Sequence, residues 1–391
     1  MFLSRPSSVL FKRPRCLAVH DLFSRDFSTS SETKSSVLPG VTLSVATSAA
    51  GFQVASILSS AIAIPISGIP VSILLGMAIK NTVGYNESTY KPGITFSTKA
   101  ILQGGIVAVA AKLSFFELLT TGTHGIPVIV SSVGAGLLFI PMAGRFAGLP
   151  EKMSLLLTAG TSICGVTAIT ALAPAINASN QSTAVAVANT VAFGTLGMLV
   201  YPYLFHEICT SSEQVGMCLG VAIHDTSQVL GSAMSYRDTF DDEVALRVAA
   251  VTKLTRNLGL AFAIPALTFV HHKTAEISDD DSIENKTETA SGLVTFQKYV
   301  PPFLVAFIAM SAFRSCGDFY FGEDASGLYH QAVGFIGNDV SKYALGTAMA
   351  GVGLSTSASS LKGVGWRPFA VGGAGALVVG GTGFTVASFL I

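Results

Sequence analysis

His224 and Asp225 are two ionisable residues that lie side by side in one of the most apolar regions of the sequence. Such groups cost about 3 kcal/mol each inside a membrane-length apolar segment, so they normally face a partner, a cavity or a transport pathway. Histidine titrates near physiological pH, which makes His224 a natural proton carrier, with Asp225 as its charge partner or as a cation ligand. A surface loop is the plainer alternative. The candidate site residues of this run are His224, Asp225, Thr226, Ser227 and Gln228.

A second candidate site is the stretch GTSICGVTAITALAP, residues 160–174. Its glycines lack side chains and Pro174 lacks a backbone donor, so the sequence predicts a break or kink within the membrane. A broken helix exposes N–H groups at the start of its second half, and these donors can bind an anion. Close packing of small residues between helices is the alternative. The candidate residues are Gly160, Thr161, Ser162, Cys164, Gly165 and Thr167.

A cationic pair, Lys253 and Arg256, begins a third apolar run. Residues three apart share one face of a helix, so both side chains point the same way. In the simpler interpretation the long side chains reach toward water and fix the end of the helix. In the alternative, both cations face inward and attract or neutralise an anion.

Composition indicates the environment that must position these residues. The chain is 50% hydrophobic and 12% charged, whereas a soluble domain carries about 25% charged residues. Apolar windows of about 20 residues recur from residue 40 onward, each long enough to cross a bilayer as a helix. We therefore expect an all-α polytopic membrane protein of about 10–11 transmembrane helices. The eleven expected segments are 40–62, 64–82, 99–118, 124–147, 155–177, 185–206, 216–234, 249–271, 298–316, 341–358 and 365–391.

Three longer polar segments are expected to be loops: residues 82–98, residues 317–338 and the acidic, Ser/Thr-rich connector 272–297. Residues 37–391 are expected to form a single membrane domain. Residues 1–36 combine basic residues with serines and apolar residues, which is typical of an organellar presequence. A mitochondrial type of processing site would cut after Phe27. A disordered tail and a plastid transit peptide are the alternatives.

The distribution of lysine and arginine predicts the orientation of the membrane domain. Positively charged residues favour the inner side of a membrane, so the N-terminus of the domain is expected in the matrix and the C-terminus on the opposite side. With eleven spans, the N-terminal side receives Lys80, Lys91, Lys99, Arg145, Lys152, Lys362 and Arg367, and the other side receives Arg237, Arg247, Arg314 and Lys342.

The sequence also contains an internal echo. Residues 105–127 align with residues 346–368, which pairs Gly105 with Gly346 and Pro127 with Pro368. An odd number of expected spans separates the two copies, so they would point in opposite directions. Inverted repeats with discontinuous helices are typical of secondary transporters.

Signatures of soluble enzymes are missing from the sequence. It contains no P-loop, dinucleotide-binding glycine motif, HExxH or GxSxG motif. The cysteines lack metal-ligand spacing, and a formal net charge of zero argues against a nucleic-acid partner. We expect no enzymatic activity, no cofactor and no bound metal.

Four stretches together resemble the YeiH-type membrane protein family, whose members carry the label of sulfate exporters. These stretches are GTSICG (160–165), IHDTSQV (223–229), KLTR (253–256) and GTAMAGVGLSTSASSLKGVGWRPF (346–369). The resemblance runs from about Pro39 to the C-terminus. It implies an α-helical carrier of the cation/proton antiporter and anion transporter superfamily, with two inverted repeats whose discontinuous helices cross near the bilayer midplane. The sequence departs from the bacterial pattern at Asp225, where glutamate is common, and at Val166–Ile169, which reads VTAI in place of ASAI.

The resemblance and the candidate residues favour a secondary transporter for a small inorganic anion such as sulfate or sulfite, with proton coupling as an option, in the mitochondrial inner membrane. The half-helix N-termini and hydroxyls would bind the anion, His224 and Asp225 would couple or gate its movement, and the cationic pair would supply positive potential. A proton-coupled monovalent cation antiporter that uses Asp225, and a non-transporting membrane scaffold, are the alternatives. The plastid envelope and the plasma membrane are the alternative locations, and related carriers often form homodimers.

Overall fold

The computed structural model describes residues 36–62, 66–277, 302–321, 327–357 and 365–390. Apart from Ser36, the predicted presequence and its processing site lie outside these residues. So do residues 278–297 of the predicted acidic connector, and Lys362.

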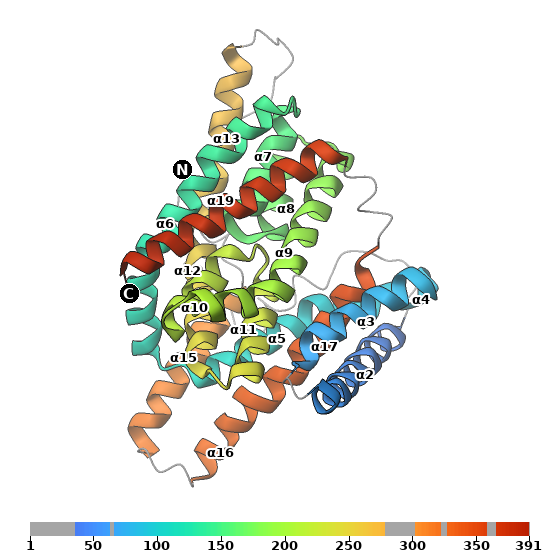
Figure 1. Ribbon diagram of the computed structural model, residues 1–391, viewed down its shortest axis with the longest axis vertical. Helices are drawn as coiled ribbons and strands as arrows, with labels where there is room; N and C mark the ends of the chain where they lie inside the picture. Colours follow the sequence, from blue (N-terminus) through green and yellow to red (C-terminus); the bar gives the residue numbers. More distant parts are fainter. Residues whose placement is uncertain (1–35, 63–65, 278–301, 322–326, 358–364, 391) are drawn as a thin grey trace, which may run out of the picture. The chain divides into compact units, whose positions relative to one another are not determined.

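The described residues form helices and no strands, which confirms the expected all-α fold. They group into eleven helical runs, some interrupted (Figure 1). The runs are α2 (Leu38–Ile62), α3 (Gly68–Thr82), α4 with α5 (Glu87–Phe96, Leu102–Val109), α6 (Phe115–Phe146), α7 with α8 (Glu151–Ala159, Val166–Ala175), α9 (Asn180–Ile208), α10 with α11 (Ser212–Ala222, Thr226–Phe240), α12 with α13 (Glu243–Leu258, Leu260–Ile277), α15 (Pro302–Phe321), α16 with α17 (Leu328–Phe335, Ser341–Ser355) and α19 (Trp366–Leu390).

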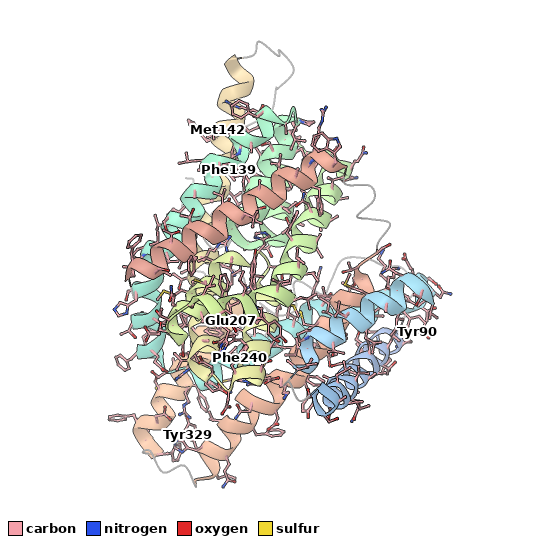
Figure 2. The ribbon with its side chains drawn as sticks, in the orientation of Figure 1. Tyr90, Phe139, Met142, Glu207, Phe240 and Tyr329 are labelled. Carbon is pink, nitrogen blue, oxygen red and sulfur yellow. The ribbon has the colours of Figure 1, made fainter. Side chains whose placement is uncertain are left out.

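Within the described residues, six helices are long and apolar enough to cross a membrane, namely 38–61, 87–112, 115–146, 180–208, 302–321 and 366–390. Their outer faces are covered with apolar side chains that no other part of the described chain buries. Leu138 on α6 and Leu377 on α19 are 78% and 72% exposed, and Met142 on α6 is one of the exposed side chains labelled in Figure 2. Lipid is the environment that fits such surfaces.

Two predicted loops are largely helical. Residues 87–96 of the expected loop 82–98 form α4, which Asn86 caps by accepting the N–H of Ser88 at 3.1 Å. Much of the expected loop 317–338 belongs to α15 and α16. The ends of membrane helices that reach water carry polar residues, so a hydropathy pattern assigns them to loops.

The expected span 99–118 is divided between two helices. The chain breaks at Leu113 and Ser114, and Ser114 starts α6 with a capping box in which its hydroxyl accepts the N–H of Glu117 at 3.1 Å. Such a pair satisfies two backbone donors at the start of a helix. The apolar residues on both sides of the break hide it from a hydropathy window.

Two of the eleven runs return to the side on which they begin. In hairpin 1 (residues 151–175), the Lys152 ammonium donates to the carbonyl of Asn177 at 3.1 Å, so the start of α7 lies beside the end of α8. In hairpin 2 (residues 212–240), α10 starts just after α9 ends, and Tyr236 near the end of α11 contacts His206 of α9 at 3.1 Å. Both hairpins therefore re-enter the membrane.

The hairpins enter from opposite sides, because the 29-residue helix α9 connects the end of hairpin 1 to the start of hairpin 2. We call these sides the Lys152 side and the Arg237 side. The sequence predicts discontinuous helices, and the chain is indeed interrupted at Gly165 and at residues 223–225. The two helices of each hairpin fold back on each other where a membrane-crossing run was expected. Each helix has 9 to 15 residues and rises about 14–23 Å, so it alone is shorter than a hydrocarbon core of ~30 Å.

The helices form two bundles that share α15 as a neighbour. The first bundle consists of α2, α3, α4, α5, α16 and α17, and the second consists of α6 to α13 and α19. In the first bundle α5 packs against α17, with Gly105 beside Leu345 and Gly337 beside Lys112. These contacts make the two helices antiparallel, so the helices that carry Gly105 and Gly346 run in opposite directions, as the internal echo predicts. In the second bundle α6 lies along α19 (Figure 1).

Candidate functional site

The tips of the two hairpins meet within the second bundle. A β-carbon placed on Gly165 would lie only 3.1 Å from the Cα atom of Asp225. Gly165 also has φ +73° and ψ −131°, a backbone conformation that residues with a side chain rarely adopt. Glycine at this position therefore both turns the chain between α7 and α8 and lets the second tip approach.

Lys253 and Arg256 of α12 lie fully inside the protein, at 0% and 1% exposure. The Lys253 ammonium donates to the carbonyl oxygens of Ile223, at 3.1 Å, and His224. The inward-facing interpretation of this pair therefore describes the structure, and the snorkelling interpretation does not.

Arg256 joins the two hairpins. Its guanidinium donates to the carbonyls of Ser162 at 3.1 Å and Thr161 at 2.8 Å in hairpin 1, and to the carbonyl of Val221 at 2.6 Å in hairpin 2. These carbonyls lie where the first arm of each hairpin ends, so they form the negative ends of two helix dipoles. One buried cation thus stabilises both interrupted helices.

Asp225 organises the tip of hairpin 2. It is the N-cap of α11, and its Oδ1 accepts the N–H of Ser227 at 2.9 Å. Thr226 accepts from the amide of Asn257 at 3.0 Å. Gln228 donates to the hydroxyl of Thr195 in α9 at 3.0 Å. Of these polar residues, Ser227 and Gln228 are buried inside the protein, whereas Asp225 and Thr226 keep partial exposure.

Part of the hydrogen-bonding capacity of His224 is unused among the described residues, as is that of the predicted site residues Ser162 and Gln228. The imidazole is 1% exposed, and its Nδ1 has no hydrogen-bond partner among the described residues. A buried polar atom without a partner is costly, and such atoms commonly bind water or a ligand. His224 lies near Lys253 and Arg256 of α12 and near the backbone of Thr161 in hairpin 1.

The hydroxyls of the first motif do not gather at the tip. Ser162 packs its hydroxyl against Gly136 of α6, and the methyl group of Thr161 faces Gly375 of α19. Thr167 is exposed on α8. The π-helical turn Gly160–Cys164 continues α7 before the break, so it directs these side chains into helix packing. Gly165 forms the turn at the tip, and the side chain of Cys164 lies near Lys253, Asp225 and Arg256. Gly160 lies one turn earlier, against Ile169 and Thr190.

The centre between the tips carries an excess of positive charge. Two basic side chains, Lys253 and Arg256, are buried here, and among the described residues the carboxylate of Asp225 lies near Lys253. The N-termini of α8 and α11 also begin at this point, and helix N-termini add partial positive charge. The arrangement is suited to a group of negative charge.

Asn257 is a site residue that the sequence reasoning did not select, although it follows Arg256 directly. Its amide binds Thr226, and its Oδ1 is buried without a partner among the described residues. The signal for it was its position one residue after the cationic pair, on the same turn of helix.

Comparison with known proteins places the chain in a family. Residues 39–372 match the family described as "Conserved hypothetical protein 698". The chain belongs to this family. The four stretches that resemble YeiH-type proteins all lie within the matched residues, so the family resemblance is confirmed.

The relatives of this chain include bacterial proteins named UPF0324 membrane protein. One from Streptococcus pyogenes serotype M18 is 30% identical over 294 residues, which cover 75% of this chain and 81% of the relative. One from Oceanobacillus iheyensis is 28% identical over 346 residues, which cover 88% and 92%. No solved structure matches the chain. The names of the relatives and the apolar helices together identify an integral membrane protein.

Proposed function

We propose that this protein is a secondary transporter for a small inorganic anion, such as sulfate or sulfite, and that the ion binds between the tips of hairpins 1 and 2. The observation that carries the proposal is the charge of the centre, where two basic side chains are fully buried and, among the described residues, one carboxylate, that of Asp225, lies near Lys253. Burying an unpaired charge in a membrane protein is costly, so a bound anion would relieve that cost.

The polar atoms around the tips fit this role. His224 is buried with an Nδ1 that has no partner among the described residues, and an imidazole N–H can donate to an anion. The charge of a bound anion would offset that of Lys253 and Arg256, so we propose that His224 gains a proton when the anion binds and thereby couples anion movement to a proton. No catalytic step is part of the proposal, because binding and release of the ion need only the backbone donors, the cations and the histidine.

Ion flux across a membrane tests the proposal directly. Purified protein in liposomes is expected to take up radiolabelled sulfate faster than protein-free liposomes, and faster still under an imposed pH gradient. Sodium and potassium fluxes are measured in the same preparation. Cation flux without sulfate movement would instead support an antiporter that uses Asp225, and no flux of any of these ions would support a membrane scaffold.

Asp225→Asn separates the anion and cation mechanisms. Asparagine caps helices about as well as aspartate, so the midpoint of thermal unfolding is expected to stay close to that of the wild type while the negative charge is lost. An anion transporter keeps sulfate uptake in this variant, because the centre becomes more positive. An antiporter that binds its cation at Asp225 loses all flux. Asp225→Ala, which removes the cap as well, is the comparison and is expected to cost about 1 kcal/mol of stability.

We also propose that the protein resides in the mitochondrial inner membrane. The basic, serine-containing composition of residues 1–36 supports this location. A fluorescent protein fused to the C-terminus is expected to co-localise with a mitochondrial marker, and to lose that location when residues 1–36 are deleted. Chemical cross-linking in the same membranes tests the predicted homodimer.

A further inference from the structure

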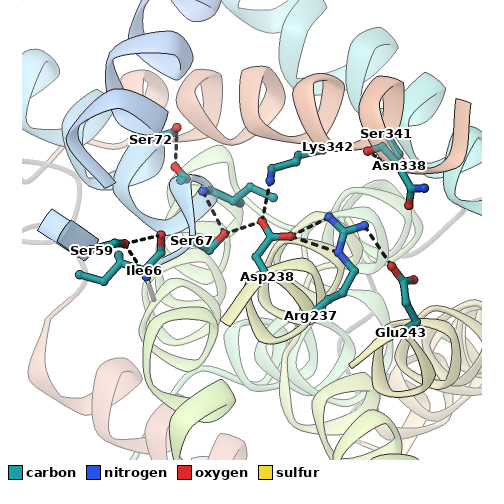
Figure 3. Close-up of polar contacts among 12 residues, drawn as sticks. Ser59, Ile66, Ser67, Ser72, Arg237, Asp238, Glu243, Asn338, Ser341 and Lys342 are labelled. Carbon is teal, nitrogen blue, oxygen red and sulfur yellow. Dashed lines mark hydrogen bonds and ion pairs between the residues drawn. The ribbon is translucent and has the colours of Figure 1, made fainter. Parts of the chain in front are cut away.

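An extended ion-pair network lies on the Arg237 side, where α11 ends and α12 begins (Figure 3). Asp238 is its centre. The carboxylate accepts from the Arg237 guanidinium at 2.7 Å and from the hydroxyl of Ser67 at 3.2 Å, and it pairs with the Lys342 ammonium at 3.4 Å.

The network continues from Arg237 to a second carboxylate. Arg237 lies 3.7 Å from Glu243, and both carboxylate oxygens of Glu243 accept from the Lys112 ammonium, at 2.7 and 2.9 Å. Cations and anions therefore alternate along the series Lys342, Asp238, Arg237, Glu243 and Lys112. Most of these side chains are largely buried, with Arg237, Asp238 and Lys112 at 9%, 11% and 12% exposure. Pairs shielded in this way hold their partners more firmly than surface pairs do.

The network joins the two bundles. Ser67 precedes α3, Lys112 follows α5 and Lys342 lies in α17, all in the first bundle, whereas Arg237, Asp238 and Glu243 belong to the second. On the Lys152 side, three contacts each lie within one bundle: Lys80 with Glu87, Lys152 with Asn177, and Glu151 with His271. The network therefore ties the two bundles together at the Arg237 side.

Helix α11 connects this network to the tips of the hairpins. It begins at the N-cap Asp225 and ends beside Asp238. It is also the main element of the second bundle that packs against α3 and α17. A helix of 15 residues moves as a rigid rod, so a displacement at one of its ends is felt at the other.

We propose that this network is an ion-pair latch that closes the Arg237 side between the bundles, and that it must open for an ion to pass to that side. The inference rests on the proposed transport function, because a carrier needs one closed side at a time. Packed interfaces of this kind switch between discrete arrangements. The conformation described here is the one with the latch closed.

Distances between spin labels on the two bundles test the latch without any transported ion. In full-length protein whose native cysteines are replaced by serine, one nitroxide pair is placed at Asp241 and Leu328 on the Arg237 side. A second pair is placed at Val83 and Phe146 on the Lys152 side. All four positions are exposed. Pulsed electron resonance then measures each distance distribution in lipid nanodiscs.

The variant Lys342→Gln with Asp238→Asn is expected to show a second, longer population for the pair at Asp241 and Leu328. The matched control, Lys80→Gln, removes an ion pair within the first bundle and is expected to leave this distribution unchanged. The conservative variant Lys342→Arg, which keeps a positive charge beside Asp238, is expected to keep the single short distance. An unchanged midpoint of thermal unfolding in the double variant shows that loss of the pair, and no general unfolding, caused the change.

An unchanged distribution at Asp241 and Leu328 in the first variant overturns the latch, whatever the uptake measurements give. A longer population in the Lys80→Gln control overturns it as well. Failure of the transport proposal has a different signature, since wild-type liposomes would then show no sulfate uptake while the spin-label distances could still respond to Lys342 and Asp238.

Discussion

Arg256→Gln is expected to lower the free energy of unfolding by about 3–5 kcal/mol and to abolish ion uptake. The wild-type guanidinium donates to three buried carbonyls that belong to two separate hairpins. Glutamine is shorter and carries one amide nitrogen with two N–H groups, so at least one of the three carbonyls would lose its donor. Thermal unfolding in detergent, followed by circular dichroism, measures the first effect, and liposome uptake measures the second.

Arg247→Gln is the matched control, because Arg247 lies on the same helix α12 and also makes an ion pair. Its side chain is 31% exposed and binds Glu117 at the protein surface, so its loss is expected to cost less than about 1 kcal/mol. If Arg256→Gln is as stable as Arg247→Gln, the guanidinium does not hold the hairpins together.

Gly165→Ala is the second large effect that the structure predicts. The residue would have to adopt φ +73°, which costs an ordinary residue about 1–3 kcal/mol. Its β-carbon would also press against Asp225, with 3.1 Å to the Cα atom and 3.2 Å to the nearest side-chain atoms. We expect the variant to unfold at a lower temperature and to take up less than about a tenth of the wild-type amount of anion. An increase of about 1.4 kcal/mol in the free-energy barrier to transport already slows uptake tenfold.

Gly104→Ala supplies the comparison for this experiment. Gly104 is a helical glycine of α5, and a β-carbon there would meet no atom within 4 Å. Alanine in the interior of a helix is favoured over glycine by about 0.5–1 kcal/mol, so this variant is expected to be at least as stable as the wild type. Equal stability and uptake for the two alanine variants would show that the tips do not approach each other as described.

Several features of the site follow from the sequence. The glycines at positions 160 and 165 predict an interrupted helix, and the chain turns at the second of them. The polar run at His224 and Asp225 predicts a functional pair that faces a partner, a cavity or a pathway, and the structure places it at a second interruption, which begins at Ile223. The first prediction rests on local chemistry, because glycine frees the backbone. The second interruption also has a local cause, because aspartate caps a helix.

The direction of the chain after each interruption could not be predicted. Hydropathy reports how long an apolar run is and not whether it crosses or returns. The decisive contact of hairpin 1 joins Lys152 to the backbone of Asn177, and a carbonyl carries no sequence signature. For the same reason the sequence left two interpretations of Lys253 and Arg256, whose partners are all carbonyl oxygens.

The ion pairs of the latch were equally invisible in the sequence. Lys112 and Glu243 are 131 residues apart, and nothing local in either segment indicates the other. Counting eleven spans assigned Lys342 and Arg237 to the same membrane side, and the structure places both in the same network. The span count thus located the side, and the packing of α11 against α3 and α17 located the contact.

Hairpin 1 enters from one face of the bilayer and hairpin 2 enters from the other. The contact between Gly165 and Asp225 therefore depends on the thickness of the bilayer. Proteins adapt to lipids of unequal chain length by tilting helices or by deforming the bilayer. Here neither hairpin spans the membrane, so a thicker bilayer would draw the two tips apart and a thinner one would press them together. We therefore expect the distance between the two hairpin tips to change with membrane thickness.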